Sequence, residues 1–235
     1  MIQPDLPPRP ADPPLRLLWL LVGVMALIEG AFHLADLGLW DFDRREGYLH
    51  GAFFRQLLTE GLLPVYEAQP WAMFLTHAFL HSGWVHLLMN GAILLAIGRL
   101  SVMVAGEART LLLFGLGAVG GGAGFALLGP DGPSVMVGAS GAGFAFLAAW
   151  KRWEFDALRA SGRSTMPVLQ FVFVLTAVNV ALHFLFGGML AWEAHLGGAI
   201  VGGLLAPILA RRFDRWRGLP MSQGERCLRR ESHDP

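Results

Sequence analysis

Long apolar runs restrict this chain more than any other feature of its sequence. A helix needs about 20 apolar residues to cross the hydrocarbon core of a bilayer. Hydrophobic residues make up 54% of the 235 residues and charged residues only 15%, which is far from the balance of a soluble domain. The expected spans are Leu15 to about Leu37, a run ending near Met103, Thr110–Leu128, the shorter Ser140–Trp150, Pro167–Phe186 and Trp192–Ala210. We therefore expect an all-α polytopic membrane protein, a bundle of six transmembrane helices.

The two chain ends and the first connection differ in composition from these runs. Residues 1–14 are rich in proline and predict a disordered cytoplasmic lead, residues 15–213 form the transmembrane domain, and residues 214–235 form a polar cytoplasmic tail. Residues 39–70 mix charges with short amphipathic pieces, none long enough to span a membrane. We expect a large extramembrane loop whose apolar faces dip into the interface.

Basic residues indicate how the chain is oriented. Of its 18 Lys and Arg residues, 15 lie before the first span, after the last, or in the second-to-third and fourth-to-fifth connections. Because cytoplasmic loops carry an excess of Lys and Arg, both termini are expected in the cytoplasm. The expected location is the inner membrane of a bacterium, with the lipid bilayer as a partner. A net charge of zero argues against a nucleic-acid partner.

One acidic residue lies inside the first span. Glu29 is one helical turn from His33, so the two side chains share a face. Because an intramembrane carboxylate is unfavourable unless it is paired or hydrated, we expect Glu29 to face protein or water in a structural role.

A serine framed by small residues is the first candidate for chemistry. Ser140 lies in the segment Gly138-Ala139-Ser140-Gly141-Ala142-Gly143, between the polar loop 129–134 and an apolar run. Glycines let another backbone approach the hydroxyl closely, as a nucleophile requires. The pattern matches a nucleophile elbow, but we expect no strand before it. The serine is expected to open a helix inside the membrane.

A histidine in the last span supplies a candidate base. Ala194, Gly198, Gly202 and Ala206 repeat every four residues around His195, and Gly141, Ala145 and Ala149 repeat in the same way after Ser140. Small residues at this spacing let membrane helices pack closely. If these faces meet, Ser140 and His195 lie at similar depth and can form the pair that activates a hydroxyl.

A third span supplies candidate oxyanion donors. His86 and Asn90 are one turn apart near the outward end of the second span. Together with the Ser140 backbone N–H at a helix start, they can stabilise the oxyanion of a tetrahedral intermediate. Glu193 is two residues before His195 and points to another side of its helix. The sequence therefore favours a Ser-His pair without a third, acidic member.

Each of these residues also has a structural explanation. Serines in membrane helices usually bond back to a carbonyl, glycines serve packing, and His and Asn join helices. Their convergence at one depth from three spans favours the catalytic interpretation.

The chain resembles the rhomboid intramembrane serine proteases. The resemblance covers roughly Trp71 to Arg212 and rests on three motifs in family order: His81-x4-His86-x3-Asn90, Gly138-Ala139-Ser140-Gly141 and Ala194-His195-x2-Gly198-x3-Gly202. It implies a rhomboid-like bundle in which Ser140 is the nucleophile, His195 the base, and His86, Asn90 and the Ser140 N–H form the oxyanion hole. It further implies that the His81 imidazole bonds backbone in the first loop and that Phe144 stacks on the catalytic imidazole. The implied substrates are transmembrane proteins cleaved near the outer interface.

The chain departs from the family pattern at two places. Family members commonly carry a Trp-Arg pair in the first loop, whereas Trp71 is followed here by Ala72. An acidic residue often follows the glycine at the end of the second span, whereas Gly98 is followed by Arg99. These departures concern loop rigidity and the cytoplasmic helix ends.

Two other functions compete with proteolysis. One is a catalytically inactive rhomboid-like protein that binds membrane clients, although such a protein usually lacks the serine or the histidine. The other is a metal-dependent membrane oxidase using His77, His81 and His86, although such enzymes need several histidine clusters with carboxylates. We expect no metal and no cofactor. For the glycines of the third span, we expect internal packing rather than self-association.

Overall fold

The computed structural model describes residues 14–41 and 43–210, and these are almost entirely helical. The elements are α1 (Arg16–Asp36), α2 (Arg44–Gly51), β1 (Phe53–Phe54), α3 (Gln56–Thr59), α4 (Gln69–Thr76), η1 (His77–Phe79), α5 (Trp84–Ala105), α6 (Glu107–Leu128), β2 (Val135–Met136), α7 (Ser140–Ala160), α8 (Met166–Leu185) and α9 (Trp192–Leu209). Apart from Pro14, the predicted lead (residues 1–14) lies outside the described residues, as does the predicted tail (214–235).

Six long helices form the bundle, as predicted. Five of them, namely α1, α5, α6, α8 and α9, are long and apolar enough to cross a membrane. The sixth, α7, continues to Ala160, and the predicted end at Trp150 is wrong. The apolar run ends at Trp150, but the helix continues because ion pairs at helical spacing stabilise the polar second half of α7. These pairs are Lys151 with Glu154 at 2.7 Å and Arg152 with Asp156 at 2.9 Å.

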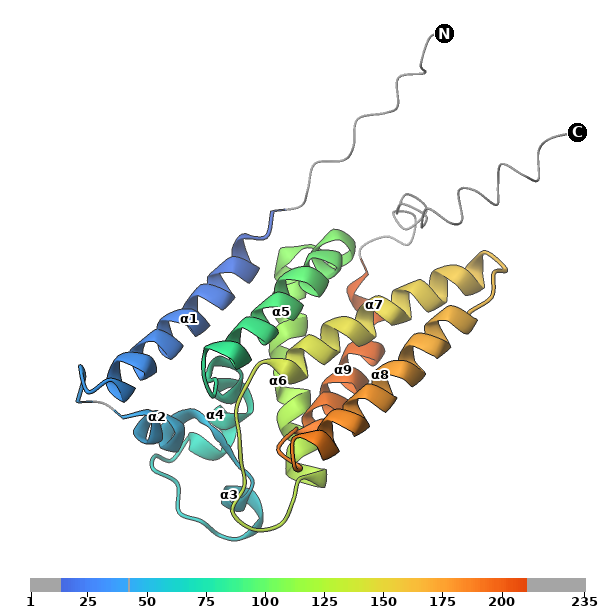
Figure 1. Cartoon of the computed structure of the whole chain (residues 1–235). Coiled ribbons are helices and arrows are strands. Elements are labelled where there is room, and N and C mark those ends of the chain that lie inside the picture. The colour runs from blue at the N-terminus through green and yellow to red at the C-terminus, as the bar shows by residue number, and fades with distance from the viewer. Residues whose placement is uncertain (1–13, 42, 211–235) are drawn as a thin grey trace, which may run out of the picture.

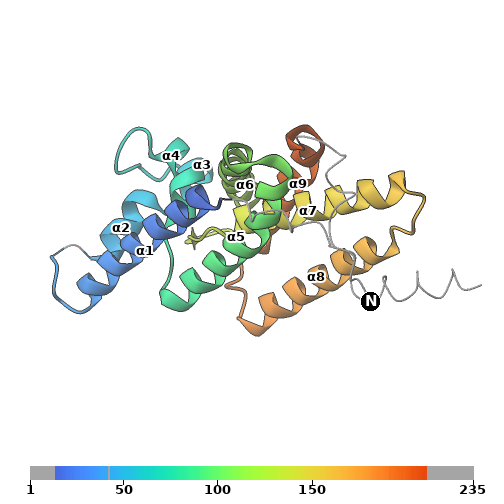
Figure 2. The ribbon, with the colours of Figure 1, turned by 90° about the horizontal axis from the view of Figure 1, so that it is seen from above.

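The arrangement separates one helix from the others. α7 runs through the middle of the bundle and packs against α5, α6 and α9 (Figure 1). α8 lies to one side of this group (Figure 2), and Val168 is its only buried residue. The short elements α2, α3 and α4 gather at one end of the bundle, whereas α1 begins and α9 ends at the other (Figure 1).

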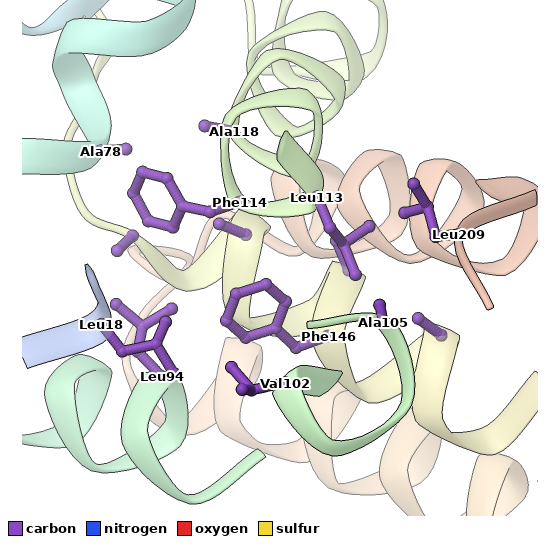
Figure 3. Close-up of a cluster of buried hydrophobic side chains, with 14 of the residues drawn as sticks. Leu18, Ala78, Leu94, Val102, Ala105, Leu113, Phe114, Ala118, Phe146 and Leu209 are labelled. Carbon is purple, nitrogen blue, oxygen red and sulfur yellow. The ribbon is translucent and has the colours of Figure 1, made fainter. Parts of the chain in front are cut away.

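The core lies where α1, α5, α6 and α7 meet. Phe146 of α7 packs among Leu18, Leu94 and Phe114, all nearly inaccessible (Figure 3). Because lipid tails are as apolar as these side chains, burial from water contributes little here. The core stabilises the bundle through many close van der Waals contacts.

An arginine fastens the first loop to the bundle. Arg44 donates to both Glu29 carboxylate oxygens, to Asp36, and to the His81 carbonyl at 2.9 Å. The Glu29 carboxylate is only 1% exposed, and its pairing confirms the expected structural role. Arg44 comes from the loop after the span, so no helical spacing predicted it.

Candidate active site

The backbone before Ser140 is fixed by a contact with the first loop. Val135–Met136 forms a two-residue strand that pairs antiparallel with Phe53–Phe54, so the expectation of no strand context is wrong. No local pattern reports this pairing, because its partner is far away in the sequence. Gly138 follows with a φ of +117°, which an L side chain rarely adopts. A Cβ there would also lie 2.8 Å from the His86 ring.

Ser140 begins α7, and α7 lies in direct backbone contact with α9. A Cβ on Gly198 would overlap the Gly141 carbonyl oxygen, and one on Gly202 would overlap the Ala145 carbonyl oxygen. The two small-residue faces predicted from the sequence therefore meet. α6 joins them, because a Cβ on Gly120 or Gly124 would overlap atoms of α9. The expected packing role holds for most third-span glycines, although Gly115 faces open space.

This packing brings Ser140 and His195 together. Ser140 Oγ lies 2.9 Å from His195 Nε2, and the imidazole is 8% exposed. On its other side the imidazole stacks on Phe144, with ring centroids 4.1 Å apart and planes 7° from parallel. The histidine is thus held by a ring face and by hydrogen bonds at its edge.

Two polar side chains of α5 converge near Gly138. A Cβ on Gly138 would lie 2.8 Å from His86 Nε2 and 3.4 Å from Asn90 Nδ2. His86 Nδ1 is engaged by the Ser82 hydroxyl at 3.0 Å, which leaves Nε2 facing the glycine. Asn90 Nδ2 is buried and has no hydrogen-bond partner in the described part of the chain. An unpaired buried donor is unfavourable unless a ligand completes it.

The position of His81 differs from the expectation. Its imidazole is fully buried edge-on against His86, with ring centroids 5.1 Å apart. Neither ring nitrogen makes a well-formed hydrogen bond within residues 14–41 and 43–210, and the nearest backbone interaction of the imidazole is a weak one with Phe79. The His81 carbonyl makes the structural contacts instead, since it accepts from Arg44 and from the Tyr48 hydroxyl. Burial and the neighbouring His86 lower the pKa of His81 to about 4.

Asn179 of α8 is a site residue that the sequence reasoning missed. Its Oδ1 lies 2.6 Å from His195 Nδ1, on the far edge of the imidazole from Ser140. The signal in the sequence was an amide in the middle of the apolar run 167–186. Polar groups at such positions indicate partners inside the bundle.

An apolar cavity of about 690 Å³ opens between α7, α8 and α9. His195, Asn179 and Phe144 line it, together with aliphatic and aromatic side chains such as Leu175 and Phe184. The cavity exists because α8 stands off from its neighbours. An apolar side chain of a bound molecule therefore has space between α8 and the edge of the His195 imidazole.

Other groups hold the loops where the family pattern is absent. Trp71 is 77% exposed and Ala72 offers no charge. Arg44 serves the first loop as described above. Arg55 donates to the Ala126 carbonyl at 3.0 Å and to Asp131 at 2.7 Å, which joins that loop to the end of α6. At the Gly98 departure, a Cβ would press on Leu18 and Phe146, so this glycine serves helix packing.

The three histidines considered for a metal do not form a metal site. Within the residues that the structure describes, no group of three His, Cys, Asp or Glu side chains is placed to hold an ion. His77 instead directs Nε2 toward the Ala118 carbonyl at 3.3 Å, away from such a role. The geometry therefore gives the oxidase alternative no support.

Comparison with known families agrees with this architecture. Residues 67–212, well over half of the chain, match the model of the rhomboid domain. None of the curated proteins matches the sequence. The match spans the helices that carry His86, Asn90, Ser140, Asn179 and His195, while α1 and most of the first loop precede it. The chain is thus an integral, multi-pass membrane protein that belongs to the rhomboid family, whose members are generally intramembrane serine proteases.

Proposed function

We propose that this protein is an intramembrane serine protease that cleaves transmembrane segments of membrane proteins near the outer interface. Ser140 is the nucleophile and His195 the general base and acid. His86 Nε2, Asn90 Nδ2 and the Ser140 backbone N–H form the oxyanion hole. The observation that carries the proposal is the 2.9 Å approach of Ser140 Oγ to His195 Nε2, near the buried Asn90 Nδ2, which has no hydrogen-bond partner within residues 14–41 and 43–210.

Each step of the proposed reaction moves one proton or breaks one bond. Ser140 Oγ attacks the peptide carbonyl carbon while His195 Nε2 takes the hydroxyl proton. The carbonyl oxygen becomes an oxyanion that accepts hydrogen bonds from the three donors, each worth on the order of 100 to 1,000-fold in rate. His195 then gives its proton to the departing amine, and the C–N bond breaks to leave an acyl-Ser140. Water, deprotonated by His195, hydrolyses that ester and restores the hydroxyl.

Substrate preference follows from the apolar surroundings of the pair. The cavity beside His195 suits the side chains of a membrane helix. A helical backbone already satisfies its own hydrogen bonds, so the segment must unwind locally before Ser140 reaches a carbonyl. We expect small or helix-weakening residues at the cleavage site. The client class is thus a transmembrane protein within the same bilayer.

Cleavage of a transmembrane reporter by purified protein in lipid-containing micelles tests the proposal. Ser140→Ala and His195→Ala are expected to lower turnover by about 10,000-fold, because each removes one member of a unit that works together. Gly203→Ala is the matched control, since a Cβ there meets nothing within 4 Å. Wild-type turnover by Ser140→Ala would refute the assignment. Binding of the reporter without cleavage by the unmodified protein would favour the client-binding alternative.

A further inference from the structure

We infer that Asn179 is a positioning residue that fixes the tautomer and orientation of His195 from the neighbouring helix. The inference deepens the proposed function and rests on it. Asn179 touches no substrate atom in this role; it acts only through the imidazole.

The orientation of the Asn179 amide follows from its two neighbours. Its Nδ2 lies 3.3 Å from the Leu175 carbonyl oxygen one turn earlier, and its Oδ1 lies 2.6 Å from His195 Nδ1. A flipped amide would set its oxygen against the Leu175 carbonyl, and two acceptors repel one another. The amide oxygen therefore faces the histidine and can only accept.

The tautomer of His195 follows in turn. Because Oδ1 accepts, the neutral imidazole carries its proton on Nδ1, and Nε2 keeps a lone pair for the Ser140 hydroxyl. That is the tautomer a general base needs. The amide dipole also stabilises the imidazolium that forms when Ser140 loses its proton. The neutral Asn179 amide thus orients the imidazole and stabilises its charged form, which an acidic residue does in a Ser-His-Asp triad.

The residue's location gives this bond a second consequence. α8 has one buried residue and borders the cavity, so few packing contacts hold it near His195. Within residues 14–41 and 43–210, one other side chain of α8 makes a hydrogen bond outside the helix. It is His183, which bonds the Leu190 carbonyl in the turn after α8. The Asn179 bond therefore joins the base to α8 itself, and the orientation of His195 depends on α8 being docked.

The kinetic test uses three variants in the transmembrane reporter assay. Asn179→Leu removes the acceptor at similar size and is expected to lower kcat by about 10 to 100-fold with KM nearly unchanged. Asn179→Asp keeps an acceptor toward His195 Nδ1 but sets its second oxygen against the Leu175 carbonyl, so its kcat should lie between those of wild type and Asn179→Leu. Gln170→Leu makes the same kind of change on the exposed side of α8 and should leave both constants unchanged. Equal kcat for Asn179→Leu and wild type overturns the inference.

A spectroscopic readout separates positioning from mere docking of α8. In protein labelled with nitrogen-15 at histidine, the His195 ring should be protonated at Nδ1 in the wild type and mixed in Asn179→Leu. The thermal midpoint of Asn179→Leu should fall only slightly, because one hydrogen bond is lost, whereas a purely structural role would lower it clearly and raise KM as well. Protonation at Nε2 in the wild type overturns the inference whatever the activity. If Ser140→Ala retains turnover, the proposed protease function fails, and the ring protonation still decides the Asn179 bond.

Discussion

Packing is tight between α7 and α9 and loose around α8 in the same bundle. Where α7 meets α9, glycines bring backbone against backbone, with no space for a methyl group at Gly198 or Gly202. Along α8, large side chains such as Phe173 and Leu185 face outward, and a cavity separates the helix from its neighbours. The first region sets the distance from Ser140 to His195, whereas the second leaves room beside them. The proposed cleavage of transmembrane segments requires both features.

The largest expected effect comes from a methyl group placed in the tight region. Gly202→Ala sets a Cβ against the Ala145 backbone, which cannot yield as a flexible side chain would. We expect a loss of about 3 kcal/mol or more in the free energy of unfolding, together with loss of reporter cleavage. Thermal and SDS-induced unfolding measure the first quantity.

The adjacent glycine provides the control. Gly203→Ala makes the same change one residue later, where nothing lies within 4 Å of the new Cβ. Its stability and activity should match those of the wild type. Equal stability of the two alanine variants would contradict the close packing of α7 on α9.

The second effect breaks the link between the first loop and α1. Arg44→Met leaves the buried Glu29 carboxylate without its partner. We expect about 2 kcal/mol of destabilisation, less than for a wholly buried pair because Arg44 keeps contact with solvent. Arg45→Met removes an exposed neighbouring charge and is the matched control. Unfolding midpoints that do not differ between these variants would show that the pair contributes nothing.

Lowering the pH is expected to reduce the free energy of unfolding through two buried histidines, His77 and His81. Burial lowers the pKa of both His77 and His81 from 6.5 to about 4. The unfolded chain therefore binds protons below about pH 6.5 while the folded chain does not. Stability is complete above that pH and falls toward pH 4, by about 1 kcal/mol per histidine between pH 7.5 and 5.5. Thermal midpoints across this range should show the slope, and His81→Leu should reduce it by the contribution of that one histidine; an unchanged slope would contradict the assignment.

The smallest effect is expected on α8. Phe173 is 74% exposed, so Phe173→Leu exchanges one lipid-facing apolar side chain for another. The unfolding free energy should stay within about 0.5 kcal/mol of the wild type. A loss comparable to that of Gly202→Ala would mean that α8 packs as closely as α9.

Sequence patterns predicted the parts of this structure that depend on local periodicity. Apolar length located the spans, and the four-residue repeats around Gly141 and Gly198 predicted the contact that brings Ser140 to His195. The extent of α7 was missed because its polar half is held by ion pairs rather than by apolarity. Asn179 was missed because its role depends on how α8 rotates about its axis, which its nearly uniform apolar surface does not reveal.

Contacts between segments far apart in the sequence could not be predicted either. The pairing of β1 with β2 and the ion pair of Arg55 with Asp131 join the first loop to residues far along the chain. No spacing rule connects such positions, because the intervening helices decide where each loop arrives. These contacts fix the backbone on which Ser140 stands.

Labelling by a fluorophosphonate tests the central claim most directly, because the reagent bonds to a serine hydroxyl when a neighbouring base activates it. The wild type should be labelled at Ser140, and both Ser140→Ala and His195→Ala should abolish the label while Gly203→Ala keeps it. An unlabelled wild type, or a label that persists in Ser140→Ala, would contradict the proposal that this hydroxyl and imidazole form a catalytic pair.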